Sequence, residues 1–201
     1  LHRVETDDVK IDPSTPTLPE VLRRSGWFTA GFWTGWYLAG EYGFDRGFLT
    51  YRNAMTDGEL VEREVASSLS DDTIAEVWRA LSDGDKKNHE DVTSPRVVEL
   101  AREALAGAPA DEPVFFFAHF FDPHYDYIPP GKWATVHDPD YDGPIDGRNF
   151  WVNPLIWREG VGRVVDDRGL RHMRALYRGE IGCADEHVGG LIDLFAEAGR
   201  R

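Results

Sequence analysis

The sequence predicts an α/β protein, and two observations carry that prediction. Residues 17–33 combine a helical segment with an aromatic and β-branched segment, which together make one helix–strand unit. Residues 113–121 form a continuous apolar run rather than an alternating one. A strand of that kind is covered on both faces, which is typical of a parallel sheet flanked by helices.

The first helix is expected to begin at Thr17, because Thr17 and Glu20 have the spacing of a capping box. Gly26 is expected to end it. The segment 27–33 that follows is rich in aromatic residues and is expected to be a strand. The glycine-rich segment 40–48 is expected to be a loop.

Three further segments have helical periodicity. Residues 57–81 are expected to be helical with a break, and Ser94 is expected to cap a helix with Pro95 at its first position. That helix should end at Gly107. Residues 168–199 are expected to form a long helix, although internal glycines leave open whether it is one helix or two. Its apolar residues recur every three or four positions: Leu170, Met173, Tyr177, Ile181, Ala184, Val188, Leu191 and Phe195.

The composition is that of one globular domain with a real core, since the chain has 201 residues of which 41% are hydrophobic. Lys plus Arg number 22 and Asp plus Glu number 36, which gives a net charge of −14. That charge disfavours nucleic acid and anionic lipid as partners. No apolar run approaches the length of a membrane span. Cys183 is the only cysteine, so an intrachain disulfide is excluded.

We expect residues 1–16 to be a linker or loop and residues 17–201 to be the central part of a single domain. The sequence opens at Leu1 and stops directly after a helix, so an interior piece of a longer protein is expected. Residues 131–167 have no sustained period and form a long loop excursion, which in a compact domain is usually functional. Three tryptophans argue against disorder there: Trp133, Trp151 and Trp157.

The apolar run after residue 113 ends in two histidines and an aspartate. Because ligands bind beyond the carboxyl ends of strands in open α/β sheets, this end is the candidate site. His119 has aromatic neighbours and is interpreted as a hydrogen-bonded core histidine, while Asp122 is interpreted as capping the turn. His124, held stiff by Pro123, is interpreted as the functional imidazole. A metal site made of all three is a weak signal, because alternate residues of a strand point opposite ways.

Other candidates are charged or aromatic. Residues 185–187 read Asp-Glu-His, but consecutive helical residues point about 100° apart, so they are interpreted as a solvated helix face rather than a metal site. Arg46 could contact an anion, or it could pair with Asp45 or a backbone carbonyl. Three aromatic residues could stack on a sugar ring or pack beneath the loop: Tyr125, Tyr127 and Trp133.

Four segments resemble, in order, the bacterial sulfatase family of the alkaline phosphatase superfamily. They run from about residue 15 to 199: TLPEVLRRSGWFTAGF, EYGFDRGF, FFFAHFFDPHYDYIPP with the later DPDYDGPIDG, and LYRGEIGCADEHVGGLIDLFAEAG. The resemblance implies helices around a mixed, mainly parallel sheet and the hydrolysis of a sulfate ester. It also implies a formylglycine nucleophile, made from Cys or Ser in a Cys/Ser-x-Pro-x-Arg motif, beside a Ca²⁺ or Mg²⁺ held by carboxylates.

The sequence departs from that family at the nucleophile and the metal. Cys183 has no proline or arginine after it, and residues 14–18 read Ser-Thr-Pro-Thr-Leu, with Leu18 where arginine is needed. The aspartate pair of the family's first strand and its later Asp-His-Gly or Asp-Asn-Gly segment are also missing. We therefore expect both groups to come from other parts of the parent chain, and no metal to bind tightly here. Only His124 matches a catalytic position of the family.

The resemblance makes the chain the central portion of a sulfatase-type hydrolase, acting on a sulfated small molecule or sulfated carbohydrate. One alternative is a phosphate or phosphonate ester hydrolase, or a phosphotransferase, of the same superfamily. The other is a non-catalytic carbohydrate- or protein-binding domain that uses residues 131–167 as its surface. The nucleophile discriminates among them: modified Cys or Ser favours sulfate, unmodified Thr or Ser favours phosphate, and none favours the binding domain.

Overall fold

The computed structural model describes residues 10–35, 38–55, 93–124, 127–147 and 165–200. Contacts divide the chain into two compact units. Unit 1 comprises Leu1–Met55, Thr93–Phe121 and His187–Arg201, and unit 2 comprises Thr56–Val92 and Asp122–Glu186. The helix expected over residues 57–81 lies outside the described residues, as do Tyr125, Trp151 and Trp157.

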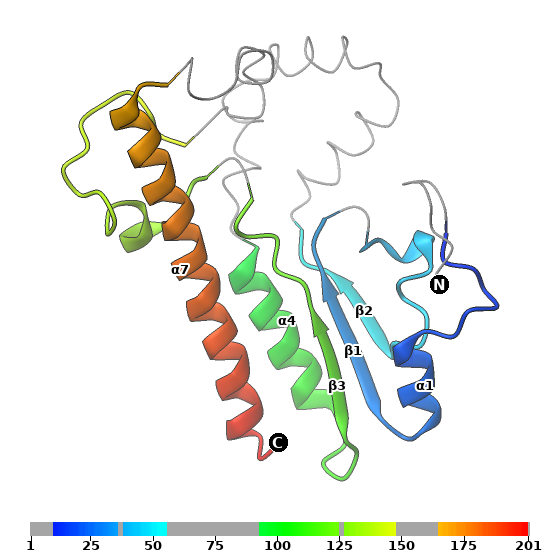
Figure 1. Ribbon diagram of the computed structural model, residues 1–201. Coiled ribbons are helices and arrows are strands. Elements are labelled where there is room, and N and C mark those ends of the chain that lie inside the picture. The colour runs from blue at the N-terminus through cyan, green and yellow to red at the C-terminus, as the bar shows by residue number, and fades with distance from the viewer. Residues whose placement is uncertain (1–9, 36–37, 56–92, 125–126, 148–164, 201) are drawn as a thin grey trace. The chain divides into compact units, whose positions relative to one another are not determined.

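Unit 1 contains a parallel three-stranded sheet, which confirms the predicted fold class (Figure 1). Its strands are β1 (Phe28–Trp33), β2 (Thr50–Asn53) and β3 (Val114–Ala118), in the order β2-β1-β3. Both neighbours of β1 run parallel to it. The two strands expected over 27–33 and 113–121 are therefore present, each shorter than its apolar run.

One face of the sheet packs on α4 (Ser94–Gly107). Ala30 and Phe32 on β1 are fully buried. The apolar stripe of α4 meets them, and its members are Val97, Leu100 and Ala101. Apolar residues spaced three and four apart place this stripe on one side of the helix, which explains why the segment folds against the sheet.

The cap of α4 differs from the prediction by one residue. Thr93, not Ser94, is the N-cap, and Ser94 is the first helical residue with Pro95 second. Proline is tolerated there because the first-turn N–H groups have no partner within the helix. The Thr93 hydroxyl does not cap the helix and instead accepts a hydrogen bond from the backbone N–H of Phe121 at 3.3 Å.

The opposite face of the sheet is aromatic. Phe48 stacks on Tyr51 with ring centroids 5.1 Å apart and on Phe115 at 6.1 Å. Gly31 of β1 lies beneath Tyr51, where a Cβ atom would stand 2.4 Å from the tyrosine ring. The Tyr51 hydroxyl donates to the Leu38 carbonyl at 2.7 Å, and burial raises the pKa of that phenol.

The helix α1 (Leu18–Arg24) begins with the predicted capping box. The Thr17 N–H donates to the Glu20 carboxylate at 2.8 Å, and the Glu20 N–H donates to the Thr17 hydroxyl at 3.4 Å. Ser25 caps the other end, and Gly26 follows with a φ of 81°, as expected of a residue that stops a helix.

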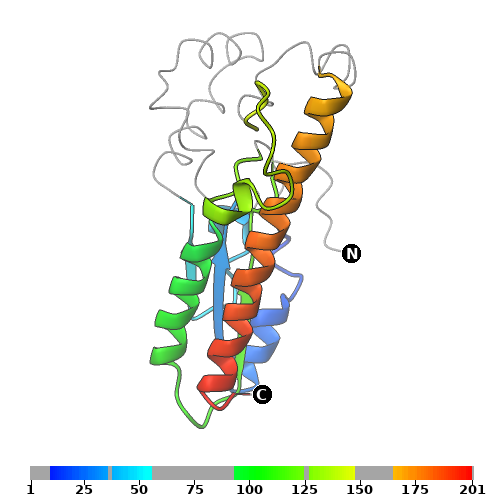
Figure 2. The same ribbon diagram turned by 90° about the vertical axis from the view of Figure 1, so that its left-hand side faces the viewer.

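The helix α7 (Asp167–Glu197) is one uninterrupted helix, which settles the alternative left open by its glycines. Its last turns belong to unit 1, where Phe195 meets Phe116 edge to face at 5.0 Å. Figures 1 and 2 both show this end of α7 beside α4. No helix in the described ranges is long and apolar enough to span a membrane.

Three of the periodic apolar residues of α7 are exposed: Tyr177, Ile181 and Val188. The buried residues of α7 include Met173, Leu176 and Cys183. Two polar residues, His172 and Glu180, are buried as well. The part of α7 in unit 2 can bury these polar groups because Ile128 bonds to Glu180 and Asp138 bonds to His172. The spacing of apolar residues gives no information about such partners.

Candidate functional site

Two strands of unit 1 end side by side, and a polar residue follows each of them. β1 ends at Trp33 and β3 at Ala118, and the register pairs Ala118 with Phe32. Thr34 and His119 therefore stand next to each other just beyond the carboxyl ends. In the order β2-β1-β3 the strand order reverses at β1. Open α/β sheets bind their ligands at such a reversal.

His119 makes the hydrogen bond that its sequence context predicts. Its Nδ1 lies 2.8 Å from the Thr34 hydroxyl, and that hydroxyl lies 3.1 Å from the His119 carbonyl. Thr34 is fully buried, whereas the His119 ring is only partly buried. Burial lowers the pKa of His119, and a hydrogen bond to the Thr34 backbone raises it by a smaller amount. The imidazole is therefore neutral at neutral pH.

The turn after β1 is held against the turn after β3. Gly35 has a φ of 78°, and its N–H faces the Met55 sulfur at 3.2 Å. A Cβ atom on Gly35 would stand 3.3 Å from the Phe121 ring and 3.9 Å from the His119 ring. Glycine is required here both by the backbone conformation and by the approach of these rings.

His124, the predicted catalytic residue, belongs to unit 2 and is partly buried. It follows a cis peptide bond between Asp122 and Pro123. Its role on substrate stays a prediction. A metal site of His119, Asp122 and His124 was only a weak signal in the sequence, and no group of three His, Cys, Asp or Glu residues in the described parts could hold an ion.

Trp133 lies against α7 in unit 2. Its Nε1 donates to the Glu186 carboxylate at 3.0 Å, and the Lys132 ammonium lies 4.7 Å from the ring centroid. A Cβ atom on Gly182 would stand 2.3 Å from the ring, so this glycine makes room for it. These contacts favour the packing interpretation of Trp133. They also occupy Glu186, in keeping with the solvated helix face expected for residues 185–187.

Arg46 anchors the start of α1. Its guanidinium donates to the Glu20 carboxylate at 2.9 Å and to the carbonyls of Asp12, Pro13 and Thr15. These partners agree with the alternative in which Arg46 binds backbone carbonyls rather than a ligand anion. The acid partner is Glu20 rather than the neighbouring Asp45.

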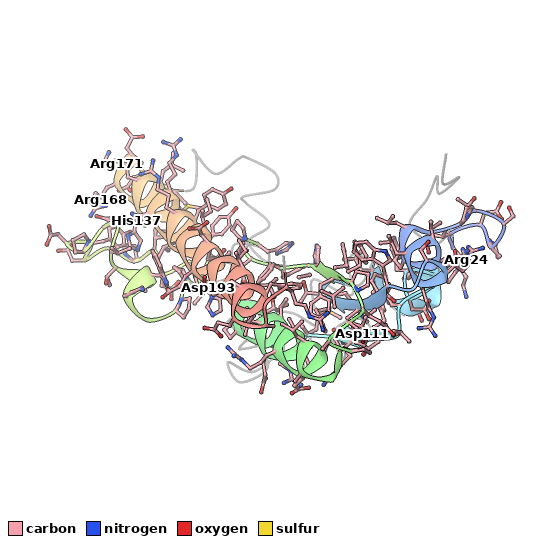
Figure 3. All side chains as sticks on the ribbon, turned by 90° about the horizontal axis from the view of Figure 1, so that it is seen from below. Arg24, Asp111, His137, Arg168, Arg171 and Asp193 are labelled. Carbon is pink, nitrogen blue, oxygen red and sulfur yellow. The ribbon has the colours of Figure 1, made fainter. Side chains whose placement is uncertain are left out.

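A charged cluster in unit 2 was not found from the sequence. Asp138 accepts two hydrogen bonds from Arg168, at 2.5 and 2.8 Å, and one contact at 2.9 Å joins it to the His172 Nδ1. Arg168 and His172 lower the pKa of Asp138 to about 2, with the Arg168 hydrogen bond the larger cause. Figure 3 shows Arg168 and His137 at the same end of α7. Tyr141 stacks on His172 with centroids 3.7 Å apart.

Tyr127, the other aromatic candidate that the structure describes, packs within unit 2. Its ring meets Tyr177 edge to face, with centroids 5.2 Å apart. Its carbonyl lies 1.9 Å from the position that a Cβ on Gly147 would take. Tyr127 thus joins the loop to α7. A stacking role for Tyr127 on substrate stays a prediction.

Cys183 should be inert in the folded protein. It is buried, and burial together with the nearby charges of Asp122, Glu186 and Glu180 raises the pKa of its thiol to about 11. Since the thiolate is the reactive form, alkylation by iodoacetamide at pH 8 should be about 100-fold slower in the native protein than in guanidinium. Mass spectrometry of timed samples measures both rates. Equal rates would contradict the burial of this thiol.

The fold defines an α/β protein with a parallel sheet, and polar residues follow the carboxyl ends of two of its strands. The family model "Sulfatase" matches residues 2–201. The chain therefore belongs to the sulfatase family, which confirms the resemblance of its four ordered segments. No curated protein matches it significantly. At the level of the family, the chain is a member of a family of hydrolases.

Sulfatases generally bind a divalent metal, and the described residues do not fit one. Such a hard cation needs several carboxylate or carbonyl oxygens converging on one point. Within residues 10–35, 38–55, 93–124, 127–147 and 165–200 no three acidic, histidine or cysteine residues converge in that way. Two acidic residues of unit 2 are engaged otherwise: Asp138 by Arg168 and Glu186 by Trp133.

Proposed function

We propose that this chain is the central portion of a hydrolase that cleaves sulfate esters, with His124 acting on the leaving group. The observation that supports the proposal most is the sulfatase family match over residues 2–201. His124 supports it further, because it follows the β3 strand, matches the family's catalytic histidine and is only partly buried.

His124 suits the leaving group because of the charge that the reaction creates. When the S–O bond of a sulfate ester breaks, negative charge grows on the departing oxygen. A positioned imidazolium can donate a hydrogen bond or a proton to that oxygen, which leaves the neutral imidazole and the alcohol. Pro123 restricts the backbone that presents His124, so the donor is held rather than free to swing.

The nucleophile and the metal are proposed to come from outside these 201 residues. The sequence contains no Cys/Ser-x-Pro-x-Arg motif, and Cys183 is buried in the middle of α7. In the parent enzyme the nucleophile would be a formylglycine, and the metal a Ca²⁺ or Mg²⁺. The substrate is proposed to be a sulfated small molecule or carbohydrate, contacted by Tyr125 and Tyr127. Arg46 and Trp133, the other two candidates, are held by protein partners instead.

The proposal predicts a difference between this chain and the complete enzyme. The purified 201-residue chain should hydrolyse no 4-nitrophenyl sulfate, because it lacks the nucleophile motif. The complete enzyme should hydrolyse that ester faster than 4-nitrophenyl phosphate. A continuous assay of released nitrophenol measures all three rates. Turnover by the chain alone that a chelator abolishes would contradict the division of the site, and a preference for phosphate would favour the phosphoesterase alternative.

A further inference from the structure

His119 and Thr34 form a closed chain of hydrogen bonds at the carboxyl edge of the sheet. The Thr34 oxygen stands between the His119 Nδ1, at 2.8 Å, and the His119 carbonyl oxygen, at 3.1 Å. Thr34 is fully buried, so water does not take either place. The protons in these hydrogen bonds must therefore come from the protein's own groups.

Only one arrangement of protons satisfies all three groups. A carbonyl oxygen can only accept, so in the contact between the Thr34 hydroxyl and the His119 carbonyl the single proton of the hydroxyl goes to the carbonyl. The Thr34 oxygen then accepts from Nδ1, which must carry the ring proton. The Thr34 backbone is a second acceptor for the ring. His119 is thus fixed as the Nδ1–H tautomer.

The other ring nitrogen, Nε2, is left with a bare lone pair. The described part of the chain places no hydrogen-bond donor on it, while Nδ1 and the His119 N–H and carbonyl all have partners. The ring is partly exposed and stands where the strand order reverses, beside the close-packed Gly35. An acceptor of fixed direction at a ligand-binding edge is suited to a ligand that carries a hydrogen-bond donor.

We propose that His119 is a substrate-binding residue that accepts, through Nε2, a hydrogen bond from a hydroxyl group on the alcohol portion of the substrate, with Thr34 holding the tautomer. The proposal rests on the proposed function. A sulfate monoester group has no proton to give at neutral pH, so a neutral Nε2 cannot recognise it. His119 therefore binds a hydroxyl group of the alcohol portion and not the sulfate group.

The tautomer can be measured without any substrate. In the protein labelled with ¹⁵N at histidine, a long-range ¹H–¹⁵N spectrum separates a protonated ring nitrogen from an unprotonated one. The His119 signals, assigned from their absence in His119→Asn or through bonds to the His119 backbone, should show a protonated Nδ1 and a bare Nε2 at pH 7.5. Thr34→Ser should keep this pattern, and Thr34→Val should lose it. A protonated Nε2 in the unsubstituted protein would overturn the proposal.

The ligand is tested by kinetics in the complete enzyme with two substrates. His119→Asn retains a donor for Thr34 and removes the Nε2 acceptor. For a sulfated sugar its KM should rise about 3- to 10-fold with kcat unchanged, the size of one neutral hydrogen bond. For 4-nitrophenyl sulfate, which carries no hydroxyl, KM should stay unchanged. Thr34→Val should follow His119→Asn, and Thr34→Ser should follow the unsubstituted enzyme.

Three results decide against a hydroxyl ligand. Equal KM changes on both substrates would mean that His119 only supports the fold. A KM change on the nitrophenyl ester alone would mean that Nε2 contacts the ester. Broadening of the His119 Nε2 signal by added Zn²⁺ at an equimolar amount would assign the lone pair to a metal. If the enzyme prefers phosphate esters, the same comparison with a sugar phosphate and 4-nitrophenyl phosphate tests His119 while the proposed function fails.

Discussion

In the complete enzyme, replacing His124 with alanine should lower the turnover of an alkyl sulfate by roughly two to four orders of magnitude, the usual value of a positioned acid. An alkoxide is a poor leaving group, so the reaction needs a proton on the departing oxygen. The measurement is kcat under saturating substrate for the unsubstituted enzyme and for His124→Ala.

The same variant should lose much less activity on 4-nitrophenyl sulfate. Nitrophenolate leaves without a proton, so the acid contributes little to that reaction. The ratio of the two losses therefore reports leaving-group catalysis rather than general damage. If both substrates lose the same activity, His124 only binds the sulfate group.

His119 supplies the internal control for His124. His119→Ala removes the Nδ1 hydrogen bond to Thr34, so it should lower the melting temperature. It should not abolish turnover of either substrate, because Nε2 contributes one neutral hydrogen bond. A stably folded His119→Ala enzyme that lost all activity would mean that the roles of the two histidines are reversed.

Local sequence patterns predicted the elements that depend on neighbours along the chain. The capping box at Thr17 and Glu20 formed because its partners are three residues apart. The apolar stripe of α4 and the apolar run of β3 are also visible in local spacing, and the predicted parallel sheet rested on that run, although the residues of β3 are only partly buried. The exact start of α4 was not predicted: its N-cap is Thr93 rather than Ser94, and the Thr93 hydroxyl accepts a hydrogen bond from the N–H of Phe121, which is distant in the sequence.

Contacts between distant segments were not predictable from those patterns. Arg46 reaches the carbonyls of residues 12–15, and Asp138 meets Arg168 across a separation of 30 residues. No spacing rule connects such pairs, and the sequence around a charged residue does not show whether its side chain is solvated or bonded to another residue. For this reason Arg46 was a candidate for an anion, and the cluster around Asp138 was missed.

The candidate site was predictable in position but not in chemistry. The end of the apolar run indicated a candidate site just past the strand, but His119 was interpreted as a core histidine within it. The structure ends β3 at Ala118 and places His119 beyond that end, beside Thr34. The tautomer of His119 depends on Thr34, a residue 85 positions away. Only the folded arrangement shows that the buried hydroxyl must give its proton to the His119 carbonyl.

Gly47→Ala should be the most destabilising substitution of a small residue in unit 1. Gly47 has a φ of 86°, and a Cβ atom there would stand 2.1 Å from the Glu20 nitrogen and 2.5 Å from the Pro19 carbonyl carbon. Both are backbone atoms, so no side-chain rotation relieves the clash. The Gly47 carbonyl also accepts from the buried Thr29 hydroxyl at 2.8 Å, which ties the segment to β1.

The expected cost of Gly47→Ala is about 3 kcal/mol or more, from overpacking and a strained backbone together. For a chain of this length that corresponds to a fall of about 6–12 °C in the melting temperature. Gly107→Ala is the matched control, because a Cβ atom at the end of α4 would meet nothing within 4 Å. Its melting temperature should stay unchanged or rise slightly, since alanine favours a helix over glycine. Melting followed by circular dichroism compares the two variants. Equal melting temperatures would mean that the segment around Gly47 is not held against α1, and that the Arg46 contacts do not order the start of that helix.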